Sequence, residues 1–569
     1  MEKAIEIKDL SFTYKDQPDG KALKDITLDV PKGEFLMILG HSGAGKSTLA
    51  NCFNGLIPNL VKGKYEGIVI ANGKNAAEHA VSIMARDVGL VFQDFENQLF
   101  STNVRLEIAF SPENFSFPHE EMDGIIDEIL NLIDLKDFDF REPSTLSGGQ
   151  KQRIAIGSVL AGKPSILCMD EPTTDLDPIS KSEVFKIAKQ LRSYGEITLI
   201  VIEHETEEAL NADRVLIMKS GEIFRIGVAR DVLCDIQAFD TCGIMPIPIP
   251  KFFYMYKGRK PDILPLTLKE GIDAFQQCEI VIRDDRYTEL LANDAEREKG
   301  YGELLIDVRN LSYTYPNGVV ALDNINMQVR KGEFLAIVGH NGSGKTTLIK
   351  HFNGLLRPTE GSVTVCGKDT HKHSIFELGC DVGLVFQNPD HQIFSESIYD
   401  EVAFSPKLRG VPKSELKMRV AEALQSVDLD GFENEDPFSM SKGVRQRIAV
   451  ASVLSGRPKV IILDEPTTGL DYSGQKKMMK LVKKLNERGH TVIMVTHAMW
   501  VVAEYAHRVA IVHNGKIIMS GSTREVFSNG DKLREYSLRT PQITDLSSNF
   551  CKTLLSIDEM LYCTEDLGG

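Results

Sequence analysis

One glycine-rich pattern occurs twice in this chain and constrains its fold more than any other feature. Residues 40–47 read Gly-His-Ser-Gly-Ala-Gly-Lys-Ser, and residues 339–346 read Gly-His-Asn-Gly-Ser-Gly-Lys-Thr. Both match G-x-x-x-x-G-K-[ST], the Walker A phosphate loop, in which backbone N–H groups and the lysine bind phosphates and the hydroxyl ligates Mg²⁺. An apolar stretch typical of a strand precedes each copy and a stretch compatible with a helix follows, so the phosphates are expected at a helix N-terminus. The chain is therefore predicted to bind ATP and Mg²⁺ at two sites.

The rest of the chain repeats around these loops, and a repeat of this length indicates duplicated domains rather than a solenoid. Val88-Gly-Leu-Val-Phe-Gln93 recurs at residues 382–387, and Asp170-Glu-Pro-Thr-Thr174 recurs at residues 464–468. The spacing between motifs differs slightly between the halves, which indicates small loop insertions. We predict four segments: a first nucleotide-binding domain at 1–227, a C-terminal extension plus linker at 228–302, a second domain at 303–529, and a C-terminal extension at 530–569.

Each half also has the pattern of an α/β domain. Apolar residues recur on one helical face at 122–133 and again at 416–427. Near-continuous apolar stretches follow, and they predict strands at 166–169, 198–202, 460–463 and 491–495. Strands that are apolar on both faces imply a sheet covered by helices. We therefore predict two P-loop NTPase domains in tandem, each with a helical subdomain.

Composition limits the function classes. The 569 residues are too many for one core, and 42% hydrophobic with 26% charged residues is ordinary for a soluble globular protein. A formal net charge of −16 argues against nucleic acid as a partner. No apolar run approaches 18 residues, and the charged N-terminus lacks a signal sequence. The nine cysteines include no C-x-x-C pair, so we expect reduced cytosolic thiols and neither disulfides nor a cysteine metal site.

Acidic residues at the predicted strand ends suit phosphate chemistry. Asp170 and Asp464 each end an apolar stretch, which is the position of the Walker B carboxylate that holds Mg²⁺. The adjacent Glu171 and Glu465 are candidates for the general base that activates water. One histidine follows the next strand in each half, and we expect it to contact the γ-phosphate. These residues are His204 and His497.

Leu146-Ser-Gly-Gly-Gln150, together with the motifs above and in this order, resembles the ATP-binding cassette (ABC) ATPase family. The resemblance implies that the two cassettes pair head to tail within the chain, with each ATP between the P-loop of one and the signature of the other. It also implies that Gln93 and Gln387 assist Mg²⁺ binding and catalysis, and that Tyr14 and Tyr315 stack on adenine; packing at a strand edge is the alternative for the tyrosines. The remaining nucleotide-binding candidates are Gly40, Ser42, Gly43, Gly45, Lys46, Ser47, Thr48, Gly339, Asn341, Gly342, Gly344, Lys345, Thr346, Thr347, Ser147, Gly148, Gly149, Gln150, Ser441 and Gly443, and the Mg²⁺ candidates are Ser47, Thr346, Gln93, Gln387, Asp170 and Asp464.

The second half departs from the signature pattern. Lys442 stands where a glycine belongs, and Val444 stands where glutamine belongs. A side chain at the glycine position restricts the backbone and can crowd a phosphate. Because the sites are shared in this family, the altered signature faces the P-loop that contains Lys46. The two sites are therefore expected to differ.

A narrower resemblance follows the glutamine of each half. Gln387-Asn-Pro-Asp-His-Gln-Ile-Phe394 with Asp400-Glu-Val-Ala-Phe-Ser-Pro406 is similar to the ATPases of energy-coupling-factor (ECF) transporters, and residues 93–112 are a variant. The resemblance implies a peripheral protein on the cytoplasmic side of a prokaryotic membrane. Its partners would be a transmembrane T component and a substrate-binding S component that import a vitamin or transition-metal ion. Asp94, Glu96 and Asp390 would pair with arginines of the membrane subunit; a solvated acidic loop is the alternative.

Two other functions remain open. A soluble tandem ABC protein that acts on ribosomes would need a charged helical linker and a basic surface, whereas residues 246–256 are rich in proline and aromatic residues. The second alternative is the ATPase pair of another ABC transporter class. The stretch at 387–394, which is similar to ECF ATPases, argues against it. The aromatic part of the linker is expected to dock on another part of the chain.

Overall fold

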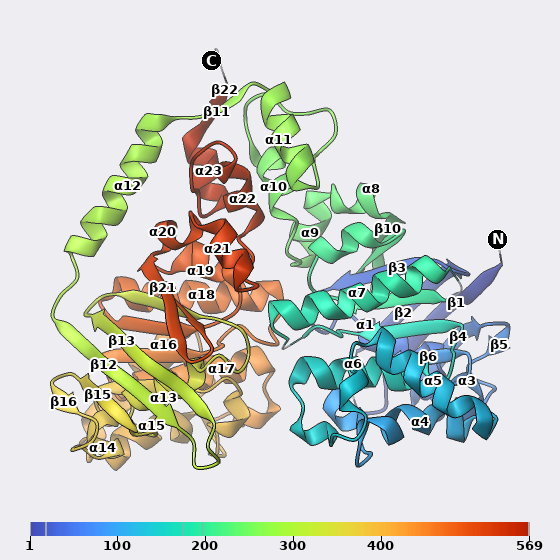
Figure 1. Cartoon of the computed structure of the whole chain (residues 1–569), viewed down its shortest axis with the longest axis horizontal. Helices are drawn as coiled ribbons and strands as arrows, with labels where there is room; N and C mark the ends of the chain where they lie inside the picture. Colours follow the sequence, from blue (N-terminus) through green and yellow to red (C-terminus); the bar gives the residue numbers. More distant parts are fainter. Residues whose placement is uncertain (1, 17–19, 175, 196, 567–569) are drawn as a thin grey trace. The chain divides into compact units, whose positions relative to one another are not determined.

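The computed structural model of this protein describes residues 2–16, 20–174, 176–195 and 197–566. The chain divides into two compact units, residues 1–251 and 252–569, each with one copy of the repeat (Figure 1). Both units contain a four-stranded antiparallel sheet and a six-stranded sheet that is parallel except for one edge strand. The predicted α/β fold with two P-loop domains in tandem is confirmed.

In unit one, the antiparallel sheet has the order β2-β1-β4-β5 and the larger sheet has the order β10-β9-β3-β8-β7-β6. Helix α1 contributes Leu49 and Phe53 to a core shared by both sheets. The strands are β1 (Lys3–Tyr14), β2 (Leu23–Pro31), β3 (Phe35–Gly40), β4 (Gly63–Ala71), β5 (Lys74–Asn75), β6 (Val88–Val91), β7 (Ile166–Asp170), β8 (Thr198–Glu203), β9 (Arg214–Lys219) and β10 (Glu222–Val228). The helices are α1 (Lys46–Phe53), α2 (Leu56–Asn59), α3 (Val81–Met84), α4 (Val104–Asn114), α5 (His119–Leu132), α6 (Gly148–Leu160), α7 (Pro178–Tyr194), α8 (Ala229–Leu233) and α9 (Ile236–Cys242), and α10 (Pro248–Met255) crosses the boundary.

Unit two repeats this plan. Its sheets have the orders β13-β12-β15-β16 and β17-β18-β19-β14-β20-β21. The strands are β12 (Leu304–Thr314), β13 (Val320–Arg330), β14 (Phe334–Val338), β15 (Glu360–Val365), β16 (Lys368–Asp369), β17 (Val382–Val385), β18 (Val460–Asp464), β19 (Thr491–Val495), β20 (Arg508–His513) and β21 (Lys516–Ser522). The helices are α13 (Lys345–Phe352), α14 (Ile375–Gly379), α15 (Ile398–Leu408), α16 (Lys413–Ser426), α17 (Lys442–Leu454), α18 (Tyr472–Glu487), α19 (Met499–Tyr505), α20 (Thr523–Phe527) and α21 (Gly530–Glu535).

The elements predicted from periodicity are present. Helices α5 and α16 occupy the two predicted amphipathic segments and bury their apolar faces. All residues of β7, β8, β18 and β19 are buried, as expected for strands covered on both sides. In these parallel strands the carboxyl ends lie together, and this places Asp170 and Asp464 beside the phosphate loops.

The predicted linker is largely folded, and it pairs with the C-terminal tail. Helix α11 (Leu268–Gln277) and β11 (Ile280–Ile282) come from the linker, whereas α22 (Gln542–Ser548), α23 (Ile557–Cys563) and β22 (Thr564–Asp566) end the described chain. Strands β11 and β22 pair antiparallel, with Ile280 opposite Asp566, and α11 contacts α22 (Figure 1). We call these elements, with residues 252–256, the C-terminal module.

Aromatic side chains form the centre of this module. Phe252 and Phe253 are fully buried and pack against Phe275 at ring-centroid distances of 5.8 and 6.0 Å. Phe275 also lies 4.7 Å from the Phe550 ring. The Tyr256 hydroxyl donates a 2.8 Å hydrogen bond to Asp566. The aromatic segment of the linker is therefore docked on elements of unit two, and the linker and the tail share one small core.

Phe275→Ala should unfold the C-terminal module locally. Truncation of a fully buried phenylalanine costs about 3–5 kcal/mol, since it removes apolar contacts and leaves a cavity. Hydrogen exchange of the amides in β11 and β22 should accelerate strongly, while exchange in β14 and β18 stays unchanged. Phe376→Ala serves as the control because Phe376 is 55% exposed. Unchanged protection of β11 and β22 in the Phe275 variant would show that the aromatic cluster does not hold the module together.

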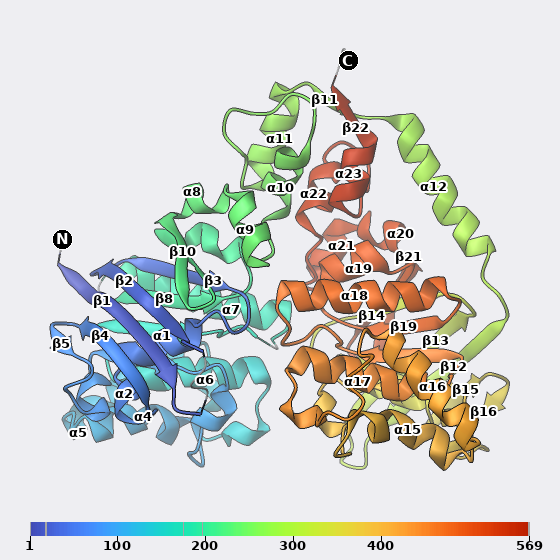
Figure 2. The ribbon, with the colours of Figure 1, turned by 180° about the vertical axis from the view of Figure 1, so that it is seen from behind.

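Helix α12 (Asp284–Lys299) connects the module to β12 (Figure 2) and has no buried residue. Its acidic residues outnumber its basic ones six to three. The linker is rich in proline and aromatic residues at 246–256, as expected, but not in this helical part. Among the residues that the structure describes, no helix combines the length and apolar character needed to span a bilayer.

Candidate functional site

The two phosphate loops have the same local geometry. Lys46 Nζ donates hydrogen bonds to the carbonyls of Gly40 (2.9 Å) and His41 (3.2 Å) and is almost buried. Lys345 does the same with Gly339 and His340, at 2.8 and 2.9 Å. Gly45 has a φ of 99°, and a Cβ there would lie 2.6 Å from the Ala22 carbonyl oxygen. Only glycine fits this turn, after which the N-terminus of α1 is available to an anion.

A hydroxyl and a carboxylate meet beside each lysine. Thr346 Oγ1 donates a 3.1 Å hydrogen bond to Asp464 Oδ2, and Ser47 hydrogen-bonds Asp170. Burial raises the pKa of Asp170 and of Asp464 to about 6, and Asp170 Oδ1 has no hydrogen-bond partner. A buried carboxylate without sufficient counter-charge, next to a hydroxyl, is the kind of oxygen donor set that Mg²⁺ prefers. These residues therefore fit the ion that the motifs predict.

In unit one, Glu171 is the centre of a polar cluster. Its carboxylate accepts hydrogen bonds from His204 Nε2 (2.8 Å) and Gln93 Nε2 (2.9 Å) and lies 3.5 Å from Lys46 Nζ. Burial acts to raise the pKa of Glu171, but the His204 hydrogen bond and the charges of His204 and Lys46 together lower it to about 2. Glu171 is therefore ionised at neutral pH, the protonation state that a general base needs.

In unit two, the equivalent cluster is simpler. His497 contacts Glu465 through Nδ1 at 3.0 Å, and the Thr468 hydroxyl donates to the same carboxylate at 3.4 Å. The effects of His497 and Lys345 lower the Glu465 pKa despite burial. Gln387 is exposed and, in the described part of the chain, makes no hydrogen bond to Glu465. The structure thus brings acid and histidine together in both units, and the glutamine in unit one alone.

The two signatures differ in structure as well as sequence. Ser147 and Gln150 form a capping box at the start of α6, with hydrogen bonds of 3.3 and 3.0 Å. Ser441 at the start of α17 makes no side-chain cap, and Val444, which replaces the glutamine, cannot supply the reciprocal bond. Lys442 lies over Gly469 of its own unit, so that a Cβ on Gly469 would collide with the ammonium and lie 3.0 Å from Cε. A Cβ on Gly148 would meet only Leu176, at 3.8 Å, so the backbone itself does not require glycine at this position.

The adenine-binding candidates lie beside the P-loop helices. Tyr14 and Tyr315 hydrogen-bond the hydroxyls of Thr48 and Thr347 at 2.9 and 3.0 Å. The ring of Tyr14 also packs edge-on against Phe12, with the centroids 5.0 Å apart. The tyrosines are only partly buried, so packing at the strand edge does not exclude a further contact with a base.

Sequence reasoning gave no role to two buried glutamates that shape the stretch after each glutamine. Glu107 is 2% exposed and accepts hydrogen bonds from the backbone N–H groups of Phe100 (3.1 Å) and Ser101 (2.8 Å). Glu401 binds residues 394 and 395 in the same way, at 3.1 and 3.0 Å. In both halves a glutamate stands three residues before Phe-Ser-Pro, and this recurrence is the sequence signal that could have indicated a shared structural role.

These glutamates hold an exposed aromatic pair in each unit. Phe100 is 62% exposed and packs edge-on against Phe110, with ring centroids 4.5 Å apart. Phe394 is 59% exposed and packs in the same way against Phe404, at 4.8 Å. We call the two pairs the aromatic knobs. Large exposed apolar groups in a fixed position favour contact with another protein.

The three acids predicted to bind a partner's arginines already have partners within their own units. Glu96 pairs with Lys151 of α6 at 2.7 Å, and Asp390 pairs with Arg445 of α17 at 2.7 Å. Asp94 accepts a 2.6 Å hydrogen bond from Asn97. The paired acids remain 58% and 43% exposed. Exposed ion pairs contribute about 0–1 kcal/mol, so an arginine from a partner can compete for these carboxylates.

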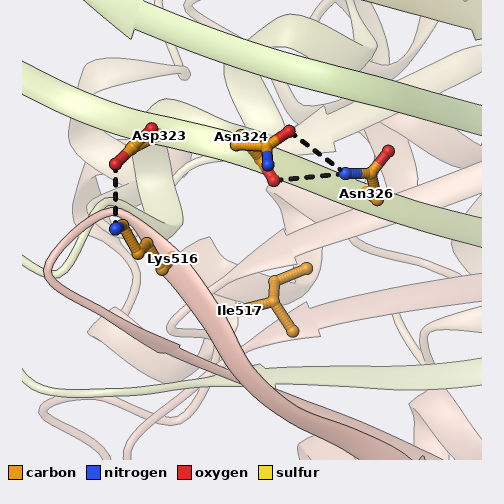
Figure 3. A pocket seen from close by; sticks show the side chains of 5 residues that line it. All are labelled: Asp323, Asn324, Asn326, Lys516 and Ile517. Atoms are coloured by element: carbon orange, nitrogen blue, oxygen red, sulfur yellow. Dashed lines mark hydrogen bonds and ion pairs between the residues drawn. The ribbon is translucent and has the colours of Figure 1, made fainter.

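A separate hollow of about 350 Å³ lies between β13 and β21 of unit two (Figure 3). It is lined by Asp323, Asn324, Asn326, Lys516 and Ile517. Lys516 pairs with Asp323 at 3.0 Å, and the Asn326 amide donates to the Asn324 carbonyl at 3.2 Å (Figure 3). Unit one has the charges reversed, with Lys24 3.6 Å from Glu222. None of the predicted nucleotide-binding residues lines this hollow, so the candidate site lies at the P-loops.

Comparison with known proteins supports the motif analysis. The sequence profile described as ABC transporter matches residues 23–174 and 322–468. A protein of Caldanaerobacter subterraneus subsp. tengcongensis, provisionally named an ABC transporter ATP-binding protein, is 57% identical over 99% of both chains. A protein of Methanosarcina acetivorans with the same provisional name is 38% identical over 98% of this chain and 92% of its own. Among solved structures, cbiO1 of Clostridium perfringens, described as part of the ABC transporter complex cbiONQ, is 37% identical, covers 43% of this chain and 99% of its own, and has a TM-score of 0.39.

Proposed function

Because the chain belongs to the ABC transporter ATP-binding proteins and carries two cassettes in one polypeptide, we propose that it is the energy-coupling ATPase of an ECF-type importer. Cassette one lies in unit one, and cassette two lies in unit two. The chain is an ATPase. In the proposed complex it binds peripherally to the cytoplasmic side of a prokaryotic membrane. There it drives the uptake of a vitamin or transition-metal ion through a T component and an S component.

The aromatic knobs are the observation that carries this proposal. They occur in both cassettes, within the stretches that resemble ECF ATPases, and a buried glutamate fixes each one. An exposed ion pair lies nearby, between the knob-bearing stretch and the signature helix. A partner helix with an apolar side chain for the knobs and an arginine for Glu96 or Asp390 would match this chemistry, since arginine–carboxylate bonds are directional and charge-assisted.

The geometry also supports specific roles in hydrolysis. Lys46 and Lys345 exchange their carbonyl partners for the phosphates. Glu171 and Glu465 accept a proton from the attacking water while His204 and His497 orient them. Water then forms the new bond to the γ-phosphorus, the bond to the β-phosphate oxygen breaks, and ADP leaves. The hydroxyl and aspartate of each cassette would hold Mg²⁺, which would neutralise phosphate charge.

Action on ribosomes is the second candidate, and α12 is the feature that bears on it. The helix is charged and exposed, as such a linker would be, but its excess charge is negative. The whole chain also carries a formal net charge of −16. Binding to nucleic acid relies on cationic contacts to phosphates, so this charge disfavours the ribosomal function.

Phe100→Ser combined with Phe394→Ser should release the chain from its membrane subunits. Loss of a buried aromatic anchor at an interface typically costs about 2 kcal/mol or more, which is roughly 30-fold in affinity. Tagged protein purified from detergent-solubilised membranes should therefore retain far less of the integral membrane partners, while ATP binding is unchanged. Phe140→Ser with Phe376→Ser is the control, since both phenylalanines are exposed and lie outside the knobs. Equal co-purification by the two double variants would refute docking through the knobs.

A further inference from the structure

One buried carboxylate in cassette one has no counterpart in cassette two. Glu203 ends β8, directly before His204, and is 2% exposed. Its Oε1 accepts hydrogen bonds from the backbone N–H (3.1 Å) and the hydroxyl (2.6 Å) of Thr173. Its Oε2 accepts a 3.1 Å hydrogen bond from the backbone N–H of His204. The nearby Lys181 is paired with Glu205, so hydrogen bonds rather than an ion pair hold the Glu203 carboxylate.

These contacts form a closed ring with those of Glu171. Thr174, the residue after Thr173, donates its hydroxyl to Glu171 Oε2 at 3.3 Å. His204 contacts the other oxygen of Glu171 through Nε2 at 2.8 Å. Glu203 therefore binds the backbone on both sides of Glu171: the turn that presents Thr174 and the segment that presents His204. The relative position of the base and its histidine is thereby fixed.

In the described part of cassette two, this ring of contacts is absent. Thr496 occupies the position of Glu203, and its hydroxyl accepts a 3.1 Å hydrogen bond from the backbone N–H of Ala498. In the described part of cassette two, no side-chain hydrogen bond joins Thr496 to Thr467, the residue that corresponds to Thr173. Glu465 keeps its contacts with His497 and Thr468. The two cassettes thus differ by one buried acid behind otherwise similar glutamate–histidine pairs.

We propose that Glu203 is a positioning residue of cassette one, which holds His204 and Thr174 in place around Glu171. Burial of a carboxylate is unfavourable unless its hydrogen bonds are satisfied, and threonine in cassette two shows that this fold does not need an acid at the strand end. The acid adds three hydrogen bonds, which hold the two segments that present Thr174 and His204 to the reacting Glu171. Supporting residues of this kind preorganise the groups that touch the substrate.

The environment of Glu203 also makes the ring sensitive to pH. Burial and the nearby Glu205 raise the pKa of Glu203 to about 7, against the opposing effects of Thr173, Lys181 and His204. Above this pH the carboxylate accepts all three hydrogen bonds. Protonation turns one oxygen into a donor and weakens its acceptance of N–H hydrogen bonds, so the ring is more stable above this pH than below it.

Glu203→Thr, which installs the residue of cassette two, tests the proposal. In a chain that also carries Glu465→Gln, single-turnover hydrolysis of radiolabelled ATP reports cassette one. Loss of a residue that orients a functional side chain commonly costs about 10–100-fold in activity. We expect at least a tenfold lower rate at pH 8 with unchanged ATP affinity. Glu203→Gln, which keeps the size of the side chain but cannot ionise, should also lower the rate at pH 8.

Hydrogen exchange in the nucleotide-free protein provides a readout that does not need turnover. Glu203→Thr should accelerate exchange of the amides of Thr173 and His204, whereas Thr496→Glu, the reciprocal control, should slow exchange of Thr467. Faster exchange together with a slower rate supports the positioning role. Faster exchange with an unchanged rate would show that Glu203 only stabilises the turn and would overturn the proposal, as would a rate that falls solely through weaker ATP binding.

Discussion

A chain that carries both Glu171→Gln and Glu465→Gln is expected to bind ATP and to hydrolyse almost none of it. Each carboxylate is ionised and lies within hydrogen-bonding distance of a histidine. A glutamine keeps the size and hydrogen bonding of the side chain but cannot accept the proton of the attacking water. General-base catalysis contributes typically about 10²–10⁴-fold, so turnover should fall by at least that factor.

Phosphate release and retained nucleotide measure the two parts of this expectation. The double variant should elute from a desalting column with unhydrolysed ATP bound, whereas the parent chain should retain mainly ADP. Glu120→Gln with Glu487→Gln is the matched control, because both of these glutamates are exposed on helices. Undiminished turnover in the Glu171 and Glu465 double variant would remove both residues from the proposed mechanism.

The single variants are expected to differ strongly, with Glu465→Gln the more damaging. In the head-to-tail arrangement that the family resemblance implies, the site of Glu465 would meet the intact signature at Ser147, whereas the site of Glu171 would meet Lys442. Lys442 lies over Gly469 and is the first residue of α17, and the capping box of α6 has no equivalent there. A flexible lysine needs reorganisation that a preorganised N–H donor does not. Loss of one such donor costs on the order of 10²–10³ in rate.

Lys442→Gly should therefore raise hydrolysis at the site of Glu171. The reciprocal change, Gly148→Lys, should slow the site of Glu465, and the open space around Gly148 indicates that the fold will accept it. Equal losses from Glu171→Gln and Glu465→Gln would contradict unequal sites unless the sites are strictly coupled. The amount of ATP left bound to either single variant after a single turnover separates these cases. Strict coupling leaves two ATP per chain because neither site hydrolyses, whereas independent, equivalent sites leave one, at the mutated site.

The parts of the fold and site that local sequence patterns specify could be predicted. The P-loops, the strand-end Asp–Glu pairs and the histidines occur at fixed distances from apolar strands, so parallel strand ends bring them together. Gln387 is the exception, since in the described part of the chain it makes no hydrogen bond to Glu465, whereas Gln93 donates one to Glu171. Asp175 is the residue of cassette one that corresponds to Gly469 of cassette two, and it lies outside the described residues.

The C-terminal module could not be predicted in the same way. Its two strands have three residues each and pair across most of the second half of the chain, too short and too distant for any periodicity to show. Local signals existed at the helix starts: Thr267 and Ser556 cap α11 and α23, each with glutamate three residues later. Those signals predict helices but not their partners.

Buried acids were the other feature that the sequence did not reveal. Glu107, Glu401 and Glu203 look like ordinary charged residues in the sequence, yet each is nearly inaccessible and accepts backbone hydrogen bonds. Their roles depend on which N–H groups the fold places opposite them. The difference between Glu203 and Thr496 was visible in the aligned halves, but its meaning required the ring of contacts around Glu171.

The central claim is that this chain powers separate membrane subunits, and native mass spectrometry tests it most directly. The tagged chain, expressed in its own organism and extracted in mild detergent, should appear as a complex of one copy of this chain with two different integral membrane proteins. Addition of ATP and Mg²⁺ to the reconstituted complex should produce hydrolysis. Recovery of the chain with ribosomal particles, or without any integral membrane protein, would contradict the account.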